Sequence, residues 1–167
     1  MLFDVNNVFW GTAPYTAGNF ASLVGLTGTT TSNSTVINLL VPEDMGIGDG
    51  EAVPKLAIYI GTGVTWATGT GTLQMAFQGS TDSNTWTTYV QSNATSTASW
   101  TAGSQILPID VPKRPAGIAL PQYYRLQLIT SGGVNISTGS ILAGIVIQRD
   151  DSADTLGQYK SGFTVGA

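Results

Sequence analysis

The chain has 167 residues, of which 10 are acidic and 6 are basic, giving a net charge of −4 and a pI near 4.3. This balance argues against a nucleic-acid partner. The absence of Cys and His excludes disulfides, Cys/His zinc sites and imidazole-dependent catalytic triads. Only 10% of the residues are charged and about a fifth are Thr or Ser. We therefore expect a surface with little charge repulsion, which gives weak protection against association with other protein molecules. The length favours a single domain over residues 1–167.

The first part of the chain is predicted to be an arm, residues 1–20. Phe9 and Trp10 place large apolar side chains near the terminus, which indicates docking either onto another protein or into the subunit's own core. No Lys or Arg precedes Lys55, so no signal peptide is predicted. No apolar run is long enough to cross a bilayer. Residues 27–35 are predicted to form a polar loop.

Short β-rich runs separated by turn residues dominate the rest of the chain. Strands are predicted at 36–41, 55–64, 73–78, 86–90 and 106–111, and Pro108 makes the last of these an edge strand. In the second run Leu56, Ile58 and Ile60 share one face. Helical spacing of apolar residues is rare. The sequence therefore predicts an all-β fold: an antiparallel β-sandwich, most consistent with a jelly roll of about eight strands, with a C-terminal tail at 151–167.

Residues 123–150 contain two strong strand patterns. Tyr124, Leu126 and Leu128 alternate with polar residues, which predicts a strand with one wet face. Gly132-Gly133 then predicts a hairpin turn into a second strand. In that strand Ile141, Ala143, Ile145 and Ile147 share a face, while Leu142 and Val146 form an apolar opposite face. Since antiparallel strands usually keep one side for water, we expect a neighbouring subunit to cover Leu142 and Val146.

No catalytic, cofactor-binding or metal site is predicted. The acidic loop 43–51 holds four carboxylates and three glycines, but its spacing fits no calcium-binding motif, and a solvated turn is the simpler interpretation. Two carboxylate pairs, Asp49 with Glu51 and Asp150 with Asp154, are the remaining candidates for acid/base chemistry. Nothing in the sequence places either pair across a cleft, so the protein is not expected to be an enzyme. The basic doublet Lys113-Arg114 is interpreted as a solvated turn.

One alternative function uses aromatic side chains. Trp66, Trp86 and Trp100 are candidates for a platform on which sugars stack, as in a carbohydrate-binding or receptor-binding module of a phage fibre. The competing interpretation is that these large side chains belong to the core.

The sequence resembles the small jelly-roll decoration, or cement, proteins of tailed-bacteriophage capsids. Three pieces carry this resemblance. They are the opening Met-Leu-Phe-Asp with its hydrophobic arm, the acidic glycine turn 44–51 leading into Leu56-Ala-Ile-Tyr-Ile60, and the stretch from Tyr123-Tyr-Arg-Leu through Gly139-Ser-Ile-Leu-Ala to Tyr159-Lys-Ser-Gly-Phe163.

The resemblance implies a structural protein of the virion that binds the outer surface of an assembled capsid as a homotrimer. Its partners would be the major capsid protein and copies of itself, with no nucleic acid, no membrane and no cofactor. We predict Leu142 and Val146 as the trimer interface. Capsid contacts are predicted at a second set of residues: Phe9, Trp10, Tyr159, Phe163 and Val165.

Overall fold

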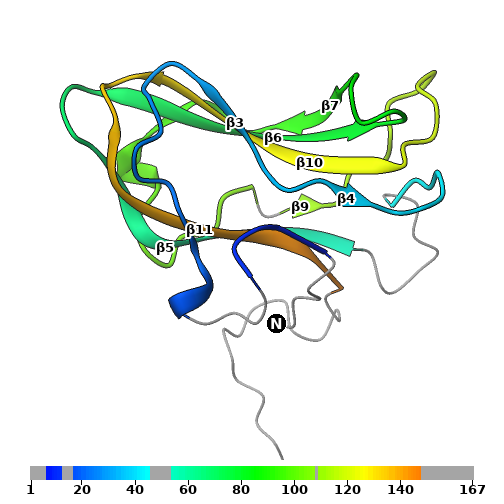
Figure 1. Ribbon diagram of the computed structural model, residues 1–167, viewed down its shortest axis with the longest axis horizontal. Helices are drawn as coiled ribbons and strands as arrows, with labels where there is room; N and C mark the ends of the chain where they lie inside the picture. The colour runs from blue at the N-terminus through cyan, green and yellow to red at the C-terminus, as the bar shows by residue number, and fades with distance from the viewer. Residues whose placement is uncertain (1–6, 13–16, 46–53, 108, 148–167) are drawn as a thin grey trace, which may run out of the picture.

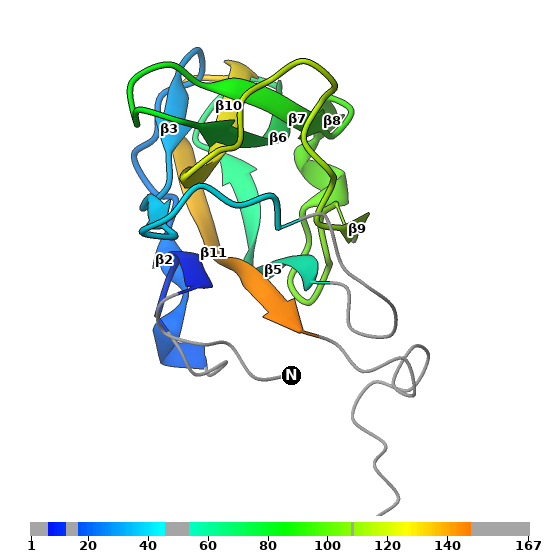
Figure 2. The ribbon, with the colours of Figure 1, turned by 90° about the vertical axis from the view of Figure 1, so that its right-hand side faces the viewer.

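The computed structural model describes residues 7–12, 17–45, 54–107 and 109–147, and it consists of two antiparallel sheets packed face to face (Figures 1 and 2). The first sheet has the order β1 (Val8–Trp10), β11 (Ile136–Ile147), β5 (Pro54–Trp66), β9 (Ile109–Asp110). The second has the order β3 (Thr31–Asn33), β10 (Tyr123–Gly132), β6 (Gly71–Ser80), β7 (Thr87–Gln91). Short pieces extend both sheets: β2 (Ala21–Ser22) pairs with β11, β4 (Ile37–Asn38) with β10, and β8 (Thr95–Ser96) with β6.

The strand order confirms the predicted jelly roll. Along the chain the eight strands named in the two sheet orders, leaving out the short β2, β4 and β8, alternate between the sheets, except that β6 and β7 are neighbours in one sheet. Two interlocked Greek keys of four strands each have this order. The structure also has two single-turn 3-10 helices, Ala17–Asn19 and Thr97–Ser99. No helix among the described residues is long and apolar enough to span a membrane.

The predicted hairpin at Gly132-Gly133 is wrong, because β10 and β11 belong to different sheets. Both glycines have positive φ, +74° and +72°, and the chain turns there from one sheet into the other. The turn is held against the β5–β6 connection by hydrogen bonds from Val134 N to Thr68 O (3.0 Å) and from Ala67 N to Asn135 O (2.7 Å). A glycine pair between two amphipathic strands can form a hairpin within one sheet or a connection between two sheets. The local sequence pattern does not distinguish these two arrangements.

The main core lies between the sheets. The faces predicted for β5 and β10 are confirmed, since Leu56, Ile58 and Ile60 from one sheet meet Leu126 and Leu128 from the other, each at most 1% exposed. Aromatic rings fill one part of this core, where the Phe77 and Tyr124 rings stack with centroids 5.4 Å apart. Burial of this apolar area is the main contribution to the stability of a chain without disulfides.

The apolar flank of β11 is covered by the chain itself, contrary to our expectation. Leu142 is 0% exposed and Val146 is 3% exposed, and both pack in a second cluster with Val8 and Ala57. Half-buried Phe20 and Tyr59 complete this cluster. Phe20, which directly precedes β2, therefore packs on the outer face of the first sheet.

One loop prediction and one strand prediction also need correction. Within the expected polar loop 27–35, residues Thr31–Asn33 form β3 at the edge of the second sheet. Of the expected strand 36–41 only β4 remains, because Leu40 takes a positive φ of +68° that ends the extended conformation. Of the expected edge strand at 106–111 only β9 remains, and its predicted place at a sheet edge is confirmed, since it ends the first sheet.

Candidate interaction surface

The predicted contact residues divide into buried, half-buried and undescribed positions. Phe9 is 0% exposed and packs in the main core, which confirms the alternative that it belongs to its own subunit. Trp10 is half-buried against the same core. Tyr159, Phe163 and Val165 lie outside the described residues. The single chain does not test a trimer contact through Leu142 and Val146, but these side chains present no exposed surface to a neighbour.

The acidic loop contributes a structural ion pair rather than an open carboxylate. The Asp44 side chain is only 2% exposed and lies 3.8 Å from Arg114 Nε, and its Oδ2 accepts a hydrogen bond from Arg114 N (3.1 Å). Arg114 also donates to the carbonyl of Ile118. Arg114 therefore links its own turn to the loop that contains Asp44. The predicted solvated turn applies to Lys113, which is exposed, and not to Arg114.

The other acidic candidates give no support for chemistry in the described ranges. Asp49, Glu51, Asp150 and Asp154 lie outside them. Among the residues that the structure does describe, no three acidic side chains gather in a way that could hold a metal ion.

Beside Asp44, the buried Tyr124 hydroxyl donates to Glu43 O (2.9 Å) and accepts from Met45 N (3.3 Å). Burial raises the pKa of Tyr124, so the phenol stays protonated and serves as an anchor for this segment.

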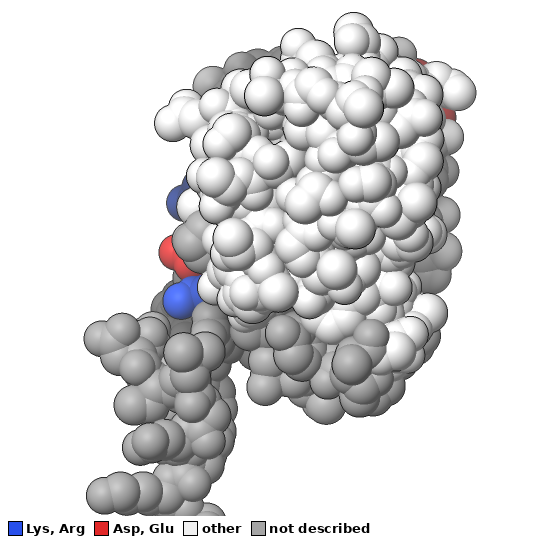
Figure 3. All heavy atoms as spheres, turned by 90° about the vertical axis from the view of Figure 1, so that its left-hand side faces the viewer, with Lys and Arg blue, Asp and Glu red and all other residues white. Residues whose placement is uncertain are grey.

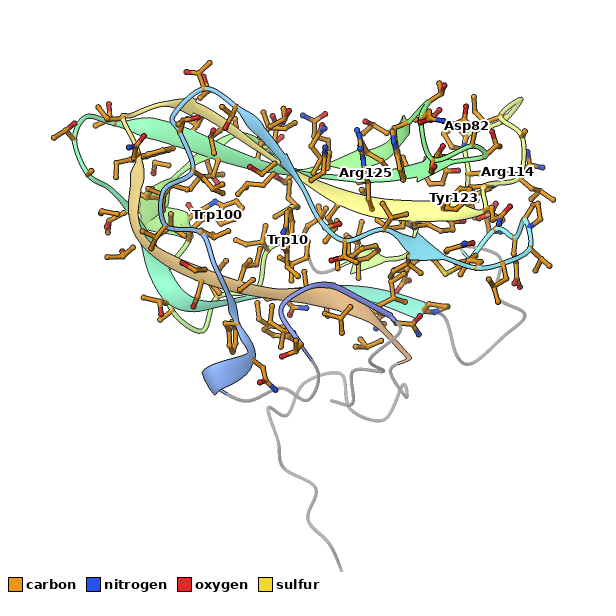
Figure 4. All side chains as sticks on the ribbon, viewed as in Figure 1. Trp10, Asp82, Trp100, Arg114, Tyr123 and Arg125 are labelled. Carbon is orange, nitrogen blue, oxygen red and sulfur yellow. The ribbon has the colours of Figure 1, made fainter. Side chains whose placement is uncertain are left out.

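The three tryptophans do not form one platform. Trp100 is 1% exposed and lies between the sheets (Figure 4), where its Nε1 donates to Thr95 Oγ1. Trp66 is half-buried near Gly133, at the end of the molecule where β6 begins. Trp86 follows the far end of β6, so the two half-buried rings are separated by roughly 25 Å along this strand. The carbohydrate-binding alternative therefore loses its shared stacking surface.

A different aromatic site is present on the outer face of the second sheet. Because Tyr124 and Leu126 point into the core, the alternation of β10 sends Arg125 outward (Figure 4). The guanidinium carbon of Arg125 lies 4.1 Å above the centre of the Trp86 ring. Arg125 Nε donates to Gln78 Oε1 (2.8 Å). A cation over the face of an indole is attracted by the ring quadrupole.

The turn between β6 and β7 fixes the Trp86 ring. Asp82 Oδ1 accepts hydrogen bonds from the backbone N–H groups of Thr85 (2.7 Å) and Asn84 (2.9 Å), and these bonds lower the pKa of Asp82 from its ordinary value of 3.8 to about 2. Ser83 takes a positive φ of +59°, and its carbonyl accepts the Trp86 Nε1 proton (3.1 Å). The carboxylate thus organises the turn that holds the ring over Arg125.

Sequence reasoning missed this pair. The wet face of β10 was predicted, but the strand register that brings Arg125 beside Trp86 was not. One signal was present: Arg125 is the only charged residue between positions 115 and 148. A single charged residue in a long uncharged stretch indicates a position where the side chain has a specific contact or function.

The described charges all lie towards one end of the sandwich. No charged residue occurs in 17–42, 56–81, 83–109 or 126–147. By strand register, the eight charged residues that are described lie near the end where β5 and β10 begin and β6 and β11 finish: Glu43, Asp44, Lys55, Asp82, Asp110, Lys113, Arg114 and Arg125. Figure 3 shows the opposite end, with charge only at its margin.

We define the charge-free end as the turns 23–30, 67–70 and 133–135. Hydrogen bonds join these turns, including Gly28 N to Val134 O (2.8 Å) and the Thr68 and Asn135 bonds given above. The Thr30 hydroxyl there also bonds within the protein, since its Oγ1 donates to Thr27 O (3.2 Å). Val24 and Val134 are 58% and 55% exposed. The result is a preorganised, weakly polar surface.

Comparison with known proteins adds no further assignment. No protein-family model matches the chain, and no curated protein sequence matches it either. The resemblance to capsid decoration proteins therefore rests on the residues quoted above.

Proposed function

We propose that the protein is a structural component of a tailed-phage virion that binds the outside of the assembled capsid as a homotrimer and stabilises the shell. The charge-free end is the observation that carries this proposal. Charged side chains are depleted from the centres of protein interfaces because removing them from water costs several kcal/mol each when they are left unpaired. A surface that presents Val24, Val134 and the internally bonded Thr30 hydroxyl avoids most of that cost.

Rigidity supports the same interpretation. Binding a flexible loop costs the entropy of ordering it, whereas turns that are already hydrogen-bonded to one another have lost this freedom in the free protein. We infer that the charge-free end faces the shell. The trimer contacts would then involve other parts of the surface, because the side chains of Leu142 and Val146 are buried within one chain.

The stabilising mechanism is mass action. A protein that binds the assembled shell, and not its separated subunits, shifts the equilibrium towards the shell. Three subunits that bind as one unit gain avidity, so each individual contact can be weak. No reaction step is required, which is consistent with a site made of hydroxyls, valines and backbone.

A matched pair of variants tests this docking surface. Val134→Asp places a charge on the charge-free end, while Leu40→Asp places one on an 80% exposed side chain elsewhere. Both proteins should fold. In co-sedimentation with heads assembled from the phage's major capsid protein, Val134→Asp should bind at least about tenfold more weakly, because an unpaired charge would be buried. Leu40→Asp should bind like the unmodified chain.

Two results would contradict the proposal. Equal binding by both variants would remove the charge-free end as the docking surface. If the unmodified protein neither sediments with the heads nor raises the temperature at which they break, the decoration function is wrong. The homotrimer is tested separately by light scattering, where a monomer at micromolar concentration would contradict it.

A further inference from the structure

Arg125 is a half-buried cation that forms no ion pair with any acidic residue that the structure describes. Among the described residues two ion pairs occur, Lys55 with Asp110 (3.9 Å) and Arg114 with Asp44 (3.8 Å). Lys113 also has no such pair, but its side chain is exposed and is hydrated by water. Arg125 instead has part of its surface removed from water, and this burial lowers the pKa of its guanidinium. Within the described residues, this partly buried positive charge is therefore not compensated by an acidic side chain.

The guanidinium is held in one orientation. Its central carbon lies 4.1 Å from the centre of the Trp86 ring, and its Nε donates to Gln78 Oε1, while Gln78 Nε2 donates to Thr88 Oγ1 (3.0 Å). Of the five N–H donors of the Arg125 guanidinium, the Nε–H is the one bonded to a described residue. The remaining four donors are on the two terminal nitrogens, which form the planar fork that matches a carboxylate. Because the side chain is already ordered, binding at this fork loses little rotamer entropy.

The nearest part of the fold does not supply the acid. Asp82 lies in the adjacent turn, but its carboxylate is engaged by Ser80, Asn84 and Thr85. The surrounding outer face is a row of amides, in which Gln78 Nε2 lies 3.4 Å from Gln127 Oε1 and Gln127 Nε2 donates to Asn33 Oδ1 (3.0 Å). Such a face offers hydrogen bonds to a second protein surface, and it brings no other charge beside the arginine.

We propose that the outer face of the β3–β10–β6–β7 sheet is a second interaction surface, on which the Arg125 fork binds an aspartate or glutamate carboxylate of a partner protein segment. One fork carries one positive charge, which suits a carboxylate better than a dianionic phosphate. Arginine and tryptophan are also the residues most enriched among those that dominate interface energies. This surface is separate from the charge-free end, so the inference does not require the partner to be a capsid.

The test uses nuclear magnetic resonance of the full chain at low salt. The probes are a short peptide of alternating glycine and aspartate and the same peptide with asparagine. Saturable shifts of the Arg125 Nε–H and Trp86 Nε1–H signals are expected with the aspartate peptide and not with the asparagine peptide. Arg125→Gln should weaken this binding at least about tenfold, because a charge-assisted hydrogen-bond pair is lost.

Lys113→Gln is the matched control, because it removes the other described cation that has no ion pair, and it should bind the peptide normally. Arg125→Lys keeps the charge but loses the planar fork, so it should bind more weakly than the unmodified chain. Absence of saturable shifts, equal shifts with both peptides, or unchanged binding by Arg125→Gln would each overturn the proposal. Tighter binding of glucuronate than of the aspartate peptide would overturn the assignment of a protein partner.

Discussion

Leu142→Ala separates a core role for this side chain from a role in subunit contact. Leu142 is 0% exposed, and a Cβ added to Gly11 would lie 2.6 Å from Leu142 Cδ1, so the side chain packs tightly against the backbone of the N-terminal segment. Truncation of a buried leucine to alanine costs about 2–5 kcal/mol, from lost transfer free energy and the remaining cavity. At about 3 kcal/mol, the melting temperature of a chain of this size should fall by roughly 6–12 °C.

The assay is urea denaturation of the variant and the unmodified chain, followed by tryptophan fluorescence at several protein concentrations. If Leu142 belongs to the subunit core, the loss in free energy of unfolding is the same at every concentration. Leu40→Ala makes the same chemical change on an 80% exposed side chain, and it should alter stability by no more than about 0.5 kcal/mol. An unchanged unfolding midpoint together with a lower particle mass would refute the core assignment and restore the subunit contact.

Three further predictions concern packing, anchoring and pH. Gly71→Ala should lower the free energy of unfolding by about 1–3 kcal/mol, because the new Cβ would lie 2.7 Å from the backbone of Gly132; Gly18→Ala, whose Cβ meets nothing within 4 Å, should be near neutral in the same denaturation assay. Tyr124→Phe should cost about 1 kcal/mol and speed hydrogen exchange at Met45, whose N–H it leaves without the phenol oxygen; Tyr123→Phe is the control, and equal exchange rates in the two variants would contradict the anchor. Because the folded pKa of Asp82 is depressed from 3.8 to about 2, its stabilisation is present above pH 3.8 and is lost as pH falls towards 2; Asp82→Asn should flatten this part of the stability profile measured by circular dichroism, and an identical profile would contradict the capped turn.

Local alternation was sufficient to predict most of the strands and their inward faces. Tyr124, Leu126 and Leu128 were assigned to the core from a two-residue period alone, and all three are fully buried. The period carries this information because successive side chains of a strand point to opposite faces. The same period does not say which distant segment covers a face. For that reason Leu142 and Val146 were recognised as an apolar face, whereas their cover by Val8 and Phe20 was not.

The Arg125–Trp86 site could not be read from the sequence for a related reason. The stack depends on β6 lying beside β10 with Gln78 opposite Arg125, and on a bulge in the pairing of β6 with β7 between Phe77 and Gln78. Register between strands is set by the whole sheet, not by either run of residues. The charge-free end, in contrast, was visible in principle, since long uncharged spans can be seen in the sequence; their gathering at one end required the strand order.

The position of β11 between β1 and β5 has a consequence for biosynthesis. Among the described strands β11 leaves the ribosome last, yet it is the strand that joins the other members of the first sheet. Until residues 136–147 emerge, β5 has an unpaired edge and the apolar side chains of both layers have no complete partner. Strand pairing between distant segments is slow, and exposed edges promote aggregation. A nascent chain of this protein is therefore expected to depend on chaperones until synthesis is almost complete.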